Sequence, residues 1–280
     1  MIPYFQFTQI EIGPIAIQVW GLLVAIGIIV GALASSHLAK KRGQDSKIIY
    51  DLTFWVIVSA FVFARLAHVF LYDPSYFAVH PLEILYVWQG GYSITGGFIG
   101  ALIAGWIYLK KRKVDFLSYA DTAIFGLPIG LFIGRIGCFL IHDHPGAITN
   151  FFLGVQFPDG AVRHDHGLYL SLNGLLLFLV FLVMVRCWIP LLTKGGLRGG
   201  LSARVALSKW DYMGLPLFTI VFLLWYGLVR FLLDFLRATQ GAIVDARYLN
   251  LTPAQYFSII MVVTGIYLFF KQKSRSKATK

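Results

Sequence analysis

Long runs of apolar residues alternate with short polar segments along the whole chain. Each run is close to the ~20 residues that a helix needs to cross the ~30 Å hydrocarbon core of a membrane. Glycine and Ser/Thr interrupt the third and fourth runs, so their ends are the least sharply defined. We expect seven membrane-spanning helices, at roughly 15–38, 50–72, 93–109, 118–141, 167–189, 213–236 and 254–270.

The composition narrows the class of protein. The 280 residues are 58% hydrophobic and only 13% charged, whereas soluble domains have about 45–50% apolar and about 25% charged residues. This excludes a water-soluble globular enzyme and a disordered chain. Two cysteines exclude a disulfide scaffold and a CxxC-type metal site. The pattern predicts an all-α polytopic membrane protein, with residues 1–280 forming one transmembrane domain.

Basic residues indicate the orientation of the spans. Of the 24 Lys and Arg residues, 18 follow spans one, three, five and seven. Cytoplasmic segments of membrane proteins carry the excess of Lys and Arg, so we expect an external N-terminus and a cytoplasmic C-terminus. Residues 142–166, between spans four and five, then form a small external head. The net charge of +11 is read as membrane topology, and no nucleic acid partner is expected.

The six remaining cations are all arginines, which leaves two interpretations. Arginine tolerates burial better than lysine, and its planar fork also suits phosphate and carboxylate groups. The set marks either buried structural side chains or an anionic headgroup site at the outer ends of the helices. Its members are Arg65, Arg135, Arg163, Arg230, Arg237 and Arg247.

Ionisable residues inside spans are costly and mark candidate functional sites. Arg65 and His68 lie three residues apart on one face of span two. Arg230, Asp234 and Arg237 share a face of span six. Asp234 is either part of a site or a structural partner that orients Arg230.

Glycines mark two places of close backbone approach. Gly126, Gly130 and Gly134 repeat every four residues in span four, a spacing that lets membrane helices pack closely. Arg135 follows directly, so this thin face could also leave room for a lipid headgroup. A second glycine-rich stretch at 90–100 predicts irregular backbone, which at membrane depth occurs only where it lines a cavity or is buried in protein.

The external head begins and ends with a His-Asp-His triplet. These are His142-Asp143-His144 and His164-Asp165-His166. Histidine and aspartate are zinc ligands, but the spacing differs from a helical HExxH site. General acid or base chemistry is the alternative, since histidine titrates near neutral pH.

Several ordered segments resemble one family. The run Gly134-Arg135-Ile136-Gly137-Cys138-Phe139 with Asp143 and Gly146 is similar to the signature of the prolipoprotein diacylglyceryl transferases, commonly GRxGNFxNxExxG. Seven spans with an external N-terminus are also that family's architecture. Further segments match in order at 12–27, 64–73, 87–101, 163–174, 226–237 and 251–259.

The resemblance implies a reaction and a location. Family members move diacylglycerol from phosphatidylglycerol to the lipobox cysteine thiol of a prolipoprotein signal peptide, and glycerol phosphate leaves. It implies a multi-pass enzyme of the bacterial inner (cytoplasmic) membrane, surrounded by membrane lipids, with its active site toward the outer face. Neither a metal nor an organic cofactor is expected.

The same resemblance assigns candidate roles. Arg135 and Arg230 would hold the headgroup phosphate, with Asp234 orienting Arg230, while Asp143 and His142 would handle protons. The remaining candidates for substrate contact are Trp20, Thr95, Gly96, Gly97, Cys138, Gly146 and Tyr169.

The chain departs from the family pattern at several of these positions. Cys138 stands where the family has asparagine, Asp143 where it has glutamate, and Thr95 where it has the histidine of an HGG motif. Trp20 replaces a tyrosine, and Asp234 a glutamate. A transferase with a relocated base is one interpretation. The alternatives are a divergent phospholipid-binding paralogue, non-catalytic or acting on another acceptor, and a zinc-dependent membrane hydrolase.

Overall fold

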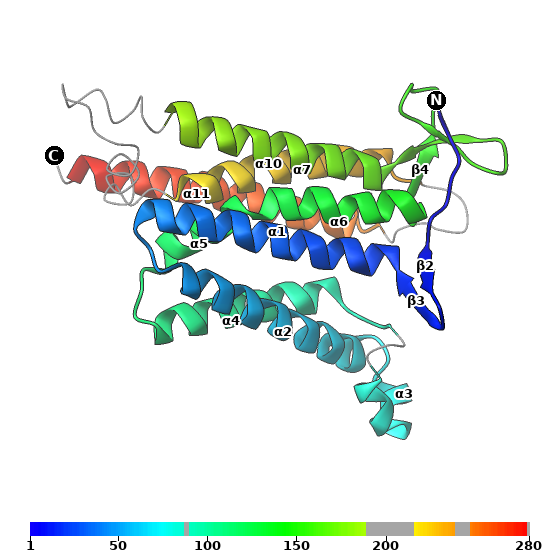
Figure 1. Ribbon diagram of the computed structural model, residues 1–280, viewed down its shortest axis with the longest axis horizontal. Coiled ribbons are helices and arrows are strands. Elements are labelled where there is room, and N and C mark those ends of the chain that lie inside the picture. Colours follow the sequence, from blue (N-terminus) through cyan, green and yellow to red (C-terminus); the bar gives the residue numbers. More distant parts are fainter. Residues whose placement is uncertain (87–89, 189–215, 239–246, 279–280) are drawn as a thin grey trace. The chain divides into compact units, whose positions relative to one another are not determined.

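The computed structural model describes residues 1–86, 90–188, 216–238 and 247–278, with side chains as far as residue 271. The fold is mostly helical (Figure 1). It divides into two compact units, the first comprising Met1–Gly43 with Ala120–Lys280 and the second Gln44–Tyr119. The single transmembrane domain stays a prediction.

The first unit is a bundle of long helices. α1 packs against α6, α6 against α7, α7 against α10, and α10 against α11, and these helices run lengthwise beside one another (Figure 1). A π-helical turn, Met184–Trp188, follows α7, and a 3₁₀ turn, Asp234–Leu236, follows α10. The bounds are α1 Val19–Arg42, α6 Leu127–Ile141, α7 His166–Val183, α10 Leu217–Leu233 and α11 Pro253–Ala278.

Two small sheets gather at one end of this bundle (Figure 1). The first has the strand order β1-β5-β6-β4, with β1 parallel to β5 and the other pairs antiparallel. Its strands are β1 Ile2–Pro3, β4 Pro145–Ile148, β5 Val155–Gln156 and β6 Val162–Asp165. The second is a hairpin of β2 (Gln9–Ile12) and β3 (Ile15–Gln18). The segment predicted as a head is therefore a sheet that recruits the N-terminal strand, which the apolar pattern did not predict.

The second unit is a pair of antiparallel helices with a short helical connection. It contains α2 (Ser46–Leu71), α3 (Pro74–Val79), a 3₁₀ helix at Pro81–Leu85 and α4 (Ile94–Lys111). α5 (Phe116–Phe125) begins in this unit and ends in the first. Side chains define where both long helices begin, because Asp45 accepts the Lys47 N–H and Ser93 accepts the Gly96 N–H.

The helices of the structure confirm most, but not all, of the predicted membrane spans. Each of the seven apolar runs contains helix, but five described helices are long and apolar enough to cross a membrane. A sixth is added if α5 and α6, bent by 42° at their junction, form one span. α4 is outside this set because its glycines and its two terminal lysines lower the mean hydropathy.

The glycine repeat of span four is a packing device, as predicted. A Cβ atom on Gly27 of α1 would lie 2.6 Å from the Gly130 carbonyl oxygen, and one on Gly31 would lie 2.8 Å from that of Gly126. The backbones of α1 and α6 therefore touch at these positions. This corrects the alternative of a headgroup space, since α1 fills the thin face of α6.

A buried ion pair fixes the C-terminal end of α1. The Arg42 Nη2 atom lies 2.9 Å from Asp121 Oδ2, with both side chains almost fully buried. The other oxygen of Asp121 accepts the Thr219 N–H at 2.8 Å at the start of α10. Arg42 was counted among the cytoplasmic cations, so part of that charge is structural.

Gly27→Ala tests the helix contact. The added methyl group would collide with the Gly130 carbonyl, so we expect a loss of about 1–3 kcal/mol in the free energy of unfolding. Gly21→Ala is the matched control, because a Cβ atom there meets nothing within 4 Å. Thermal unfolding in detergent compares the two, and equal stability of both variants would contradict the close contact.

Candidate active site

A single buried carboxylate organises the end of α10. Asp234 is fully buried, and its Oδ1 atom lies 3.1 Å from Arg230 Nη2 and 3.7 Å from Arg237 Nη1. Its Oδ2 atom accepts a hydrogen bond from the Thr252 hydroxyl. The Arg230 Nη1 atom is buried and has no hydrogen-bond partner among the described residues. Asp234 therefore orients Arg230, and one end of the guanidinium is left available.

Thr252 was missed by the sequence reasoning, although a signal for it exists. Gln255 donates its N–H to the Thr252 hydroxyl oxygen, and the Thr252 N–H donates to Gln255 Oε1. This reciprocal pair is a capping box, which the spacing Thr-x-x-Gln at the start of α11 predicts. The cap fixes the hydroxyl that holds Asp234.

Arg135 lies on α6 beside Cys138. Its Nη1 atom is 3.7 Å from the Cys138 sulfur, and Trp20 lies within interaction range of the same sulfur. Gly137 makes room for Trp20, since a Cβ atom there would lie 3.1 Å from the Trp20 Cα. The structure thus brings together three of the predicted site residues, Trp20, Arg135 and Cys138.

The two arginines belong to one electrostatic cluster. Arg135 and Arg230 lie within range of each other's charge, and both interact with Tyr226. Arg237 adds a third guanidinium, whereas Asp234 and Asp143 supply two carboxylates. Among the described residues, the cluster therefore holds three guanidinium groups and two carboxylates. Together with the unpartnered Arg230 Nη1 atom, this arrangement is suited to an anion.

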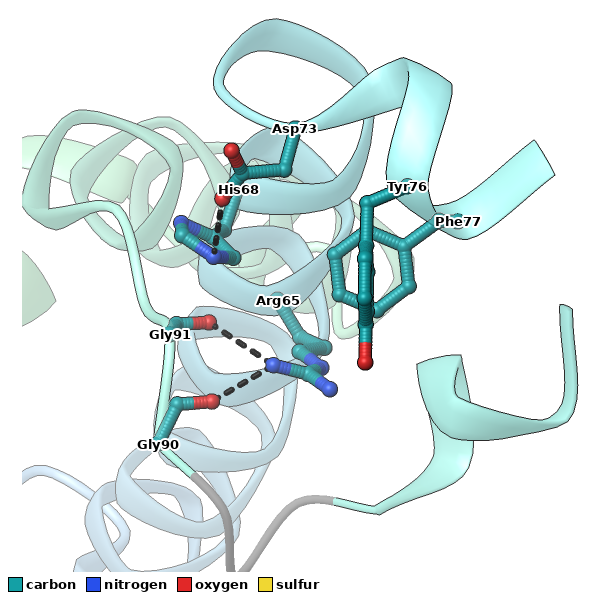
Figure 2. A pocket seen from close by; sticks show the side chains of 7 residues that line it. All are labelled: Arg65, His68, Asp73, Tyr76, Phe77, Gly90 and Gly91. Carbon is teal, nitrogen blue, oxygen red and sulfur yellow. Dashed lines mark hydrogen bonds and ion pairs between the residues drawn. The ribbon is translucent and has the colours of Figure 1, made fainter. Parts of the chain in front are cut away.

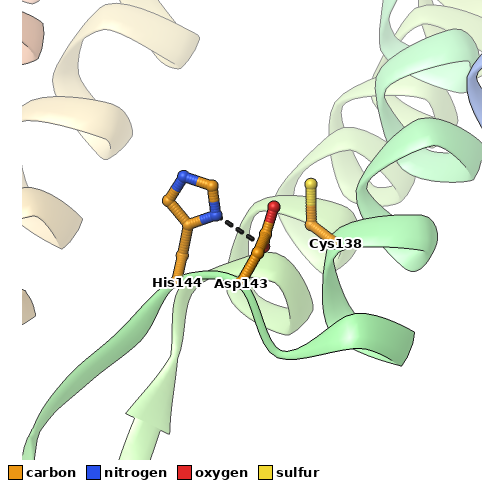
Figure 3. Close-up of side chains that lie close together, drawn as sticks. All are labelled: Cys138, Asp143 and His144. Carbon is orange, nitrogen blue, oxygen red and sulfur yellow. Dashed lines mark ion pairs between the residues drawn. The ribbon is translucent and has the colours of Figure 1, made fainter. Parts of the chain in front are cut away.

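A left-handed turn carries the chain from α6 into the head. His142 ends the helix with φ 49° and ψ 43°, so the next two residues turn back toward Cys138 (Figure 3). Asp143 Oδ1 lies 2.5 Å from His144 Nδ1. Gly146 then pairs with Arg237, and a Cβ atom there would lie 2.6 Å from the Leu236 carbonyl. Gly146 thereby lets this segment reach the arginine cluster.

His142 itself has a buried environment. Its Nδ1 atom lies 2.7 Å from Asp165 Oδ2, with both side chains 1% exposed. Tyr4, Phe5 and Phe139 pack around the ring. Asp165 also caps α7 by accepting the Leu168 N–H at 2.9 Å. The pair fixes the turn that positions Asp143 and His144.

His166 is a further residue near the cluster. Its side chain is almost fully buried and lies within electrostatic range of Arg230, Arg237 and Asp234. The second His-Asp-His triplet was the sequence signal for it, although the triplet spacing did not indicate which histidine faces the arginines.

In the described part of the chain, Tyr169 contacts residues of the head and not the arginine cluster. Its hydroxyl is 2.7 Å from His164 Nδ1, and its ring packs against Phe151. In the same head Arg163 binds Asp159 with both nitrogens, which lowers the pKa of Asp159 to about 2. Within the described residues, no hydrogen bond or ion pair joins Tyr169 to the arginine cluster.

Three predicted site residues belong to the second unit. Thr95, Gly96 and Gly97 form the first turn of α4. Gly96 permits close packing on α2, because a Cβ atom there would lie 2.5 Å from the Phe63 carbonyl oxygen. Thr95 is exposed.

Arg65, also in the second unit, has a structural role. Its Nε atom donates to the Ile84 carbonyl, Nη1 to those of Gly90 and Gly91, and Nη2 to that of Glu83, at 2.5–3.2 Å (Figure 2). Both glycines have positive φ, which presents their carbonyls to the guanidinium. Arg65 and the two glycines line a cavity of about 400 Å³, together with the ion pair of His68 and Asp73. The headgroup interpretation does not hold for Arg65, whose donors are committed to the backbone.

Comparisons with known proteins agree with the resemblance. The family model described as prolipoprotein diacylglyceryl transferase matches residues 8–271. A phosphatidylglycerol--prolipoprotein diacylglyceryl transferase of Rickettsia bellii (strain OSU 85-389) is 33% identical over 276 residues, 95% of each chain. Proteins of the same name from Cupriavidus necator and Nitrosomonas europaea are 32% and 29% identical, over 94% and 96% of this chain and 91% and 90% of theirs.

The head should be sensitive to the protonation of His164. Burial lowers the pKa of His164 below its ordinary 6.5, so its contribution to stability is full above pH 6.5 and is lost as the pH falls. We expect His164→Phe to cost about 1 kcal/mol at pH 8 and little at pH 5. Thermal unfolding in detergent at both pH values measures this, and a cost that does not change with pH would contradict it.

Proposed function

Because this chain belongs to the prolipoprotein diacylglyceryl transferase family, we propose that it transfers a diacylglyceryl group from phosphatidylglycerol to the lipobox cysteine thiol of a prolipoprotein. The sulfur bonds to the glycerol carbon, the bond from that carbon to the phosphate oxygen breaks, and glycerol phosphate leaves with its electron pair. The thiol proton passes to a base on the protein. Sulfur attacks as the thiolate.

The buried nitrogen of Arg230 that has no partner among the described residues supports this function most directly. A phosphatidylglycerol headgroup carries one negative charge, and among the described residues of the cluster the guanidinium groups outnumber the carboxylates by one. The buried Arg230 Nη1 atom needs an acceptor, and a phosphate oxygen is one. Preorganised cations of this kind stabilise the charge that develops on a leaving phosphate.

Proton transfer is assigned to Asp143 rather than His142. Asp143 lies within electrostatic range of Arg135 and contacts the partly exposed His144. His142 is enclosed by aromatic rings and paired with Asp165, so it acts as a positioning residue for the turn. Trp20, Cys138 and Gly146 would shape the headgroup site, and Thr95, Gly96, Gly97 and Tyr169 stay candidates for substrate contact on the family resemblance alone.

We extend the proposal to topology and location. Seven spans, with α4 as the third, an external N-terminus and a cytoplasmic C-terminus would place the chain in the bacterial inner membrane. The distribution of basic residues supports this orientation. The candidate site would then face outward, where the signal peptide of the prolipoprotein presents its lipobox cysteine. No cofactor is assigned.

Complementation tests the reaction. The chain is expressed in a bacterial strain depleted of its own diacylglyceryl transferase, and lipoproteins are analysed by mass spectrometry. We expect a diacylglyceryl thioether on the lipobox cysteine. Unmodified lipoproteins despite good expression and membrane insertion would contradict the proposal and favour a phospholipid-binding paralogue without this activity.

Arg135→Lys tests whether the positive charge alone is sufficient or whether the planar guanidinium group is needed. Lysine keeps the charge but loses the planar donors, so we expect a loss of transfer rate of about 10²–10³-fold. Cys138→Ser keeps a polar side chain beside Arg135 and should retain transfer. Arg112→Lys is the control, since Arg112 forms an exposed pair with Asp51. Equal activity of Arg135→Lys and the control would remove Arg135 from the mechanism.

A further inference from the structure

Three side chains with metal-binding atoms meet at the end of α6. They are Cys138, Asp143 and His144, whose potential ligand atoms all lie within 4.8 Å of one another. Figure 3 shows Cys138 on the last turn of α6 and the other two on the loop that follows, with all three side chains extending to the same side. Two of the three residues belong to the first His-Asp-His triplet and the third is a cysteine, so the set differs from a site built on both triplets.

Backbone conformation creates the cluster. Residues five and six positions beyond a helical cysteine would lie more than one turn away along a continued helix. The left-handed conformation of His142 ends the helix and reverses the chain instead. The His142–Asp165 pair holds this turn in place. The His144 carbonyl also accepts the His166 N–H at 3.4 Å, which joins the ligand loop to the start of α7.

We propose that Cys138, Asp143 and His144 form a binding site for a thiophilic divalent metal ion of the Zn²⁺ class. A thiolate, an imidazole and a carboxylate together are ligands that Zn²⁺ accepts, whereas Mg²⁺ and Ca²⁺ prefer oxygen alone. Three protein ligands leave the fourth tetrahedral position to water. The site shares Cys138 and Asp143 with the proposed transfer site, so an ion bound there would occupy the carboxylate assigned to proton transfer, and the tests below measure metal binding alone.

The geometry and charge suit such an ion. Ligand atoms no more than 4.8 Å apart allow a central ion within about 2.8 Å of all three, and small side-chain rotations reach the ~2.0–2.3 Å of zinc bonds. The Cys138 thiolate and the Asp143 carboxylate together balance the two charges of the ion. The Asp143 and His144 side chains are 29% and 37% exposed, so the cluster lies near the protein surface.

Cobalt binding tests the site directly. Purified, chelator-treated protein in detergent is titrated with Co²⁺, whose bond to a thiolate gives a charge-transfer absorption in the near ultraviolet. We expect this band in the wild type, no band in Cys138→Ser, and at least about tenfold weaker binding in His144→Ala. Cys187→Ser and His80→Ala are controls that keep the cluster. A band that persists in Cys138→Ser, or none in the wild type, would overturn the proposal.

A second measurement uses only the wild-type protein. Cys138 is labelled with a maleimide in the presence of Zn²⁺ or Mg²⁺, and the labelled peptides are identified by mass spectrometry. We expect Zn²⁺ to slow labelling of Cys138 at least about tenfold and Mg²⁺ to have no effect, while Cys187 reacts equally in both. Equal labelling of Cys138 with either ion would refute metal binding there, whatever the outcome of the transfer assay.

Discussion

Three partly buried arginines that share two carboxylates are the constraint on which the rest of the site depends. A charge in the interior of a membrane protein is costly unless it is paired. Asp234 meets part of that need for Arg230 and Arg237, and it is itself held by Thr252 at the cap of α11. The Arg230 Nη1 atom has no hydrogen-bond partner among the described residues and needs an acceptor. A phospholipid headgroup supplies one without leaving the membrane, which is why this nitrogen favours a lipid substrate.

The head contributes further residues to this cluster. The left-handed turn at His142 directs Asp143 and His144 toward α6, and Gly146 allows the following strand to touch the chain at Leu236 and Arg237. Tight packing of α1 on α6 through glycines holds Trp20 against Gly137 and Cys138. Elements that are distant in the sequence therefore meet around Arg135 because small residues and one strained turn permit close approach.

The sequence predicted the helices better than the site. Apolar runs placed α1, α2, α7, α10 and α11 well, since burial in lipid demands long apolar helices. The Gly126 and Gly130 contact was also predictable from spacing. Periodicity carries no information about the bend between α5 and α6, the recruitment of β1 into the head, or the turn at His142. It also could not tell that the donors of Arg65 are used by backbone carbonyls, because only the folded loop brings those carbonyls near.

Native mass spectrometry of the purified protein would test most directly whether the arginine excess holds a phospholipid. The protein is offered equal amounts of phosphatidylglycerol and a zwitterionic phospholipid with the same acyl chains. We expect the wild type to retain phosphatidylglycerol preferentially and Arg230→Gln, which leaves Asp234 in place, to lose that preference. An equal retention of both lipids by the wild type, or an unchanged preference in Arg230→Gln, would contradict the central role of the Arg230 guanidinium.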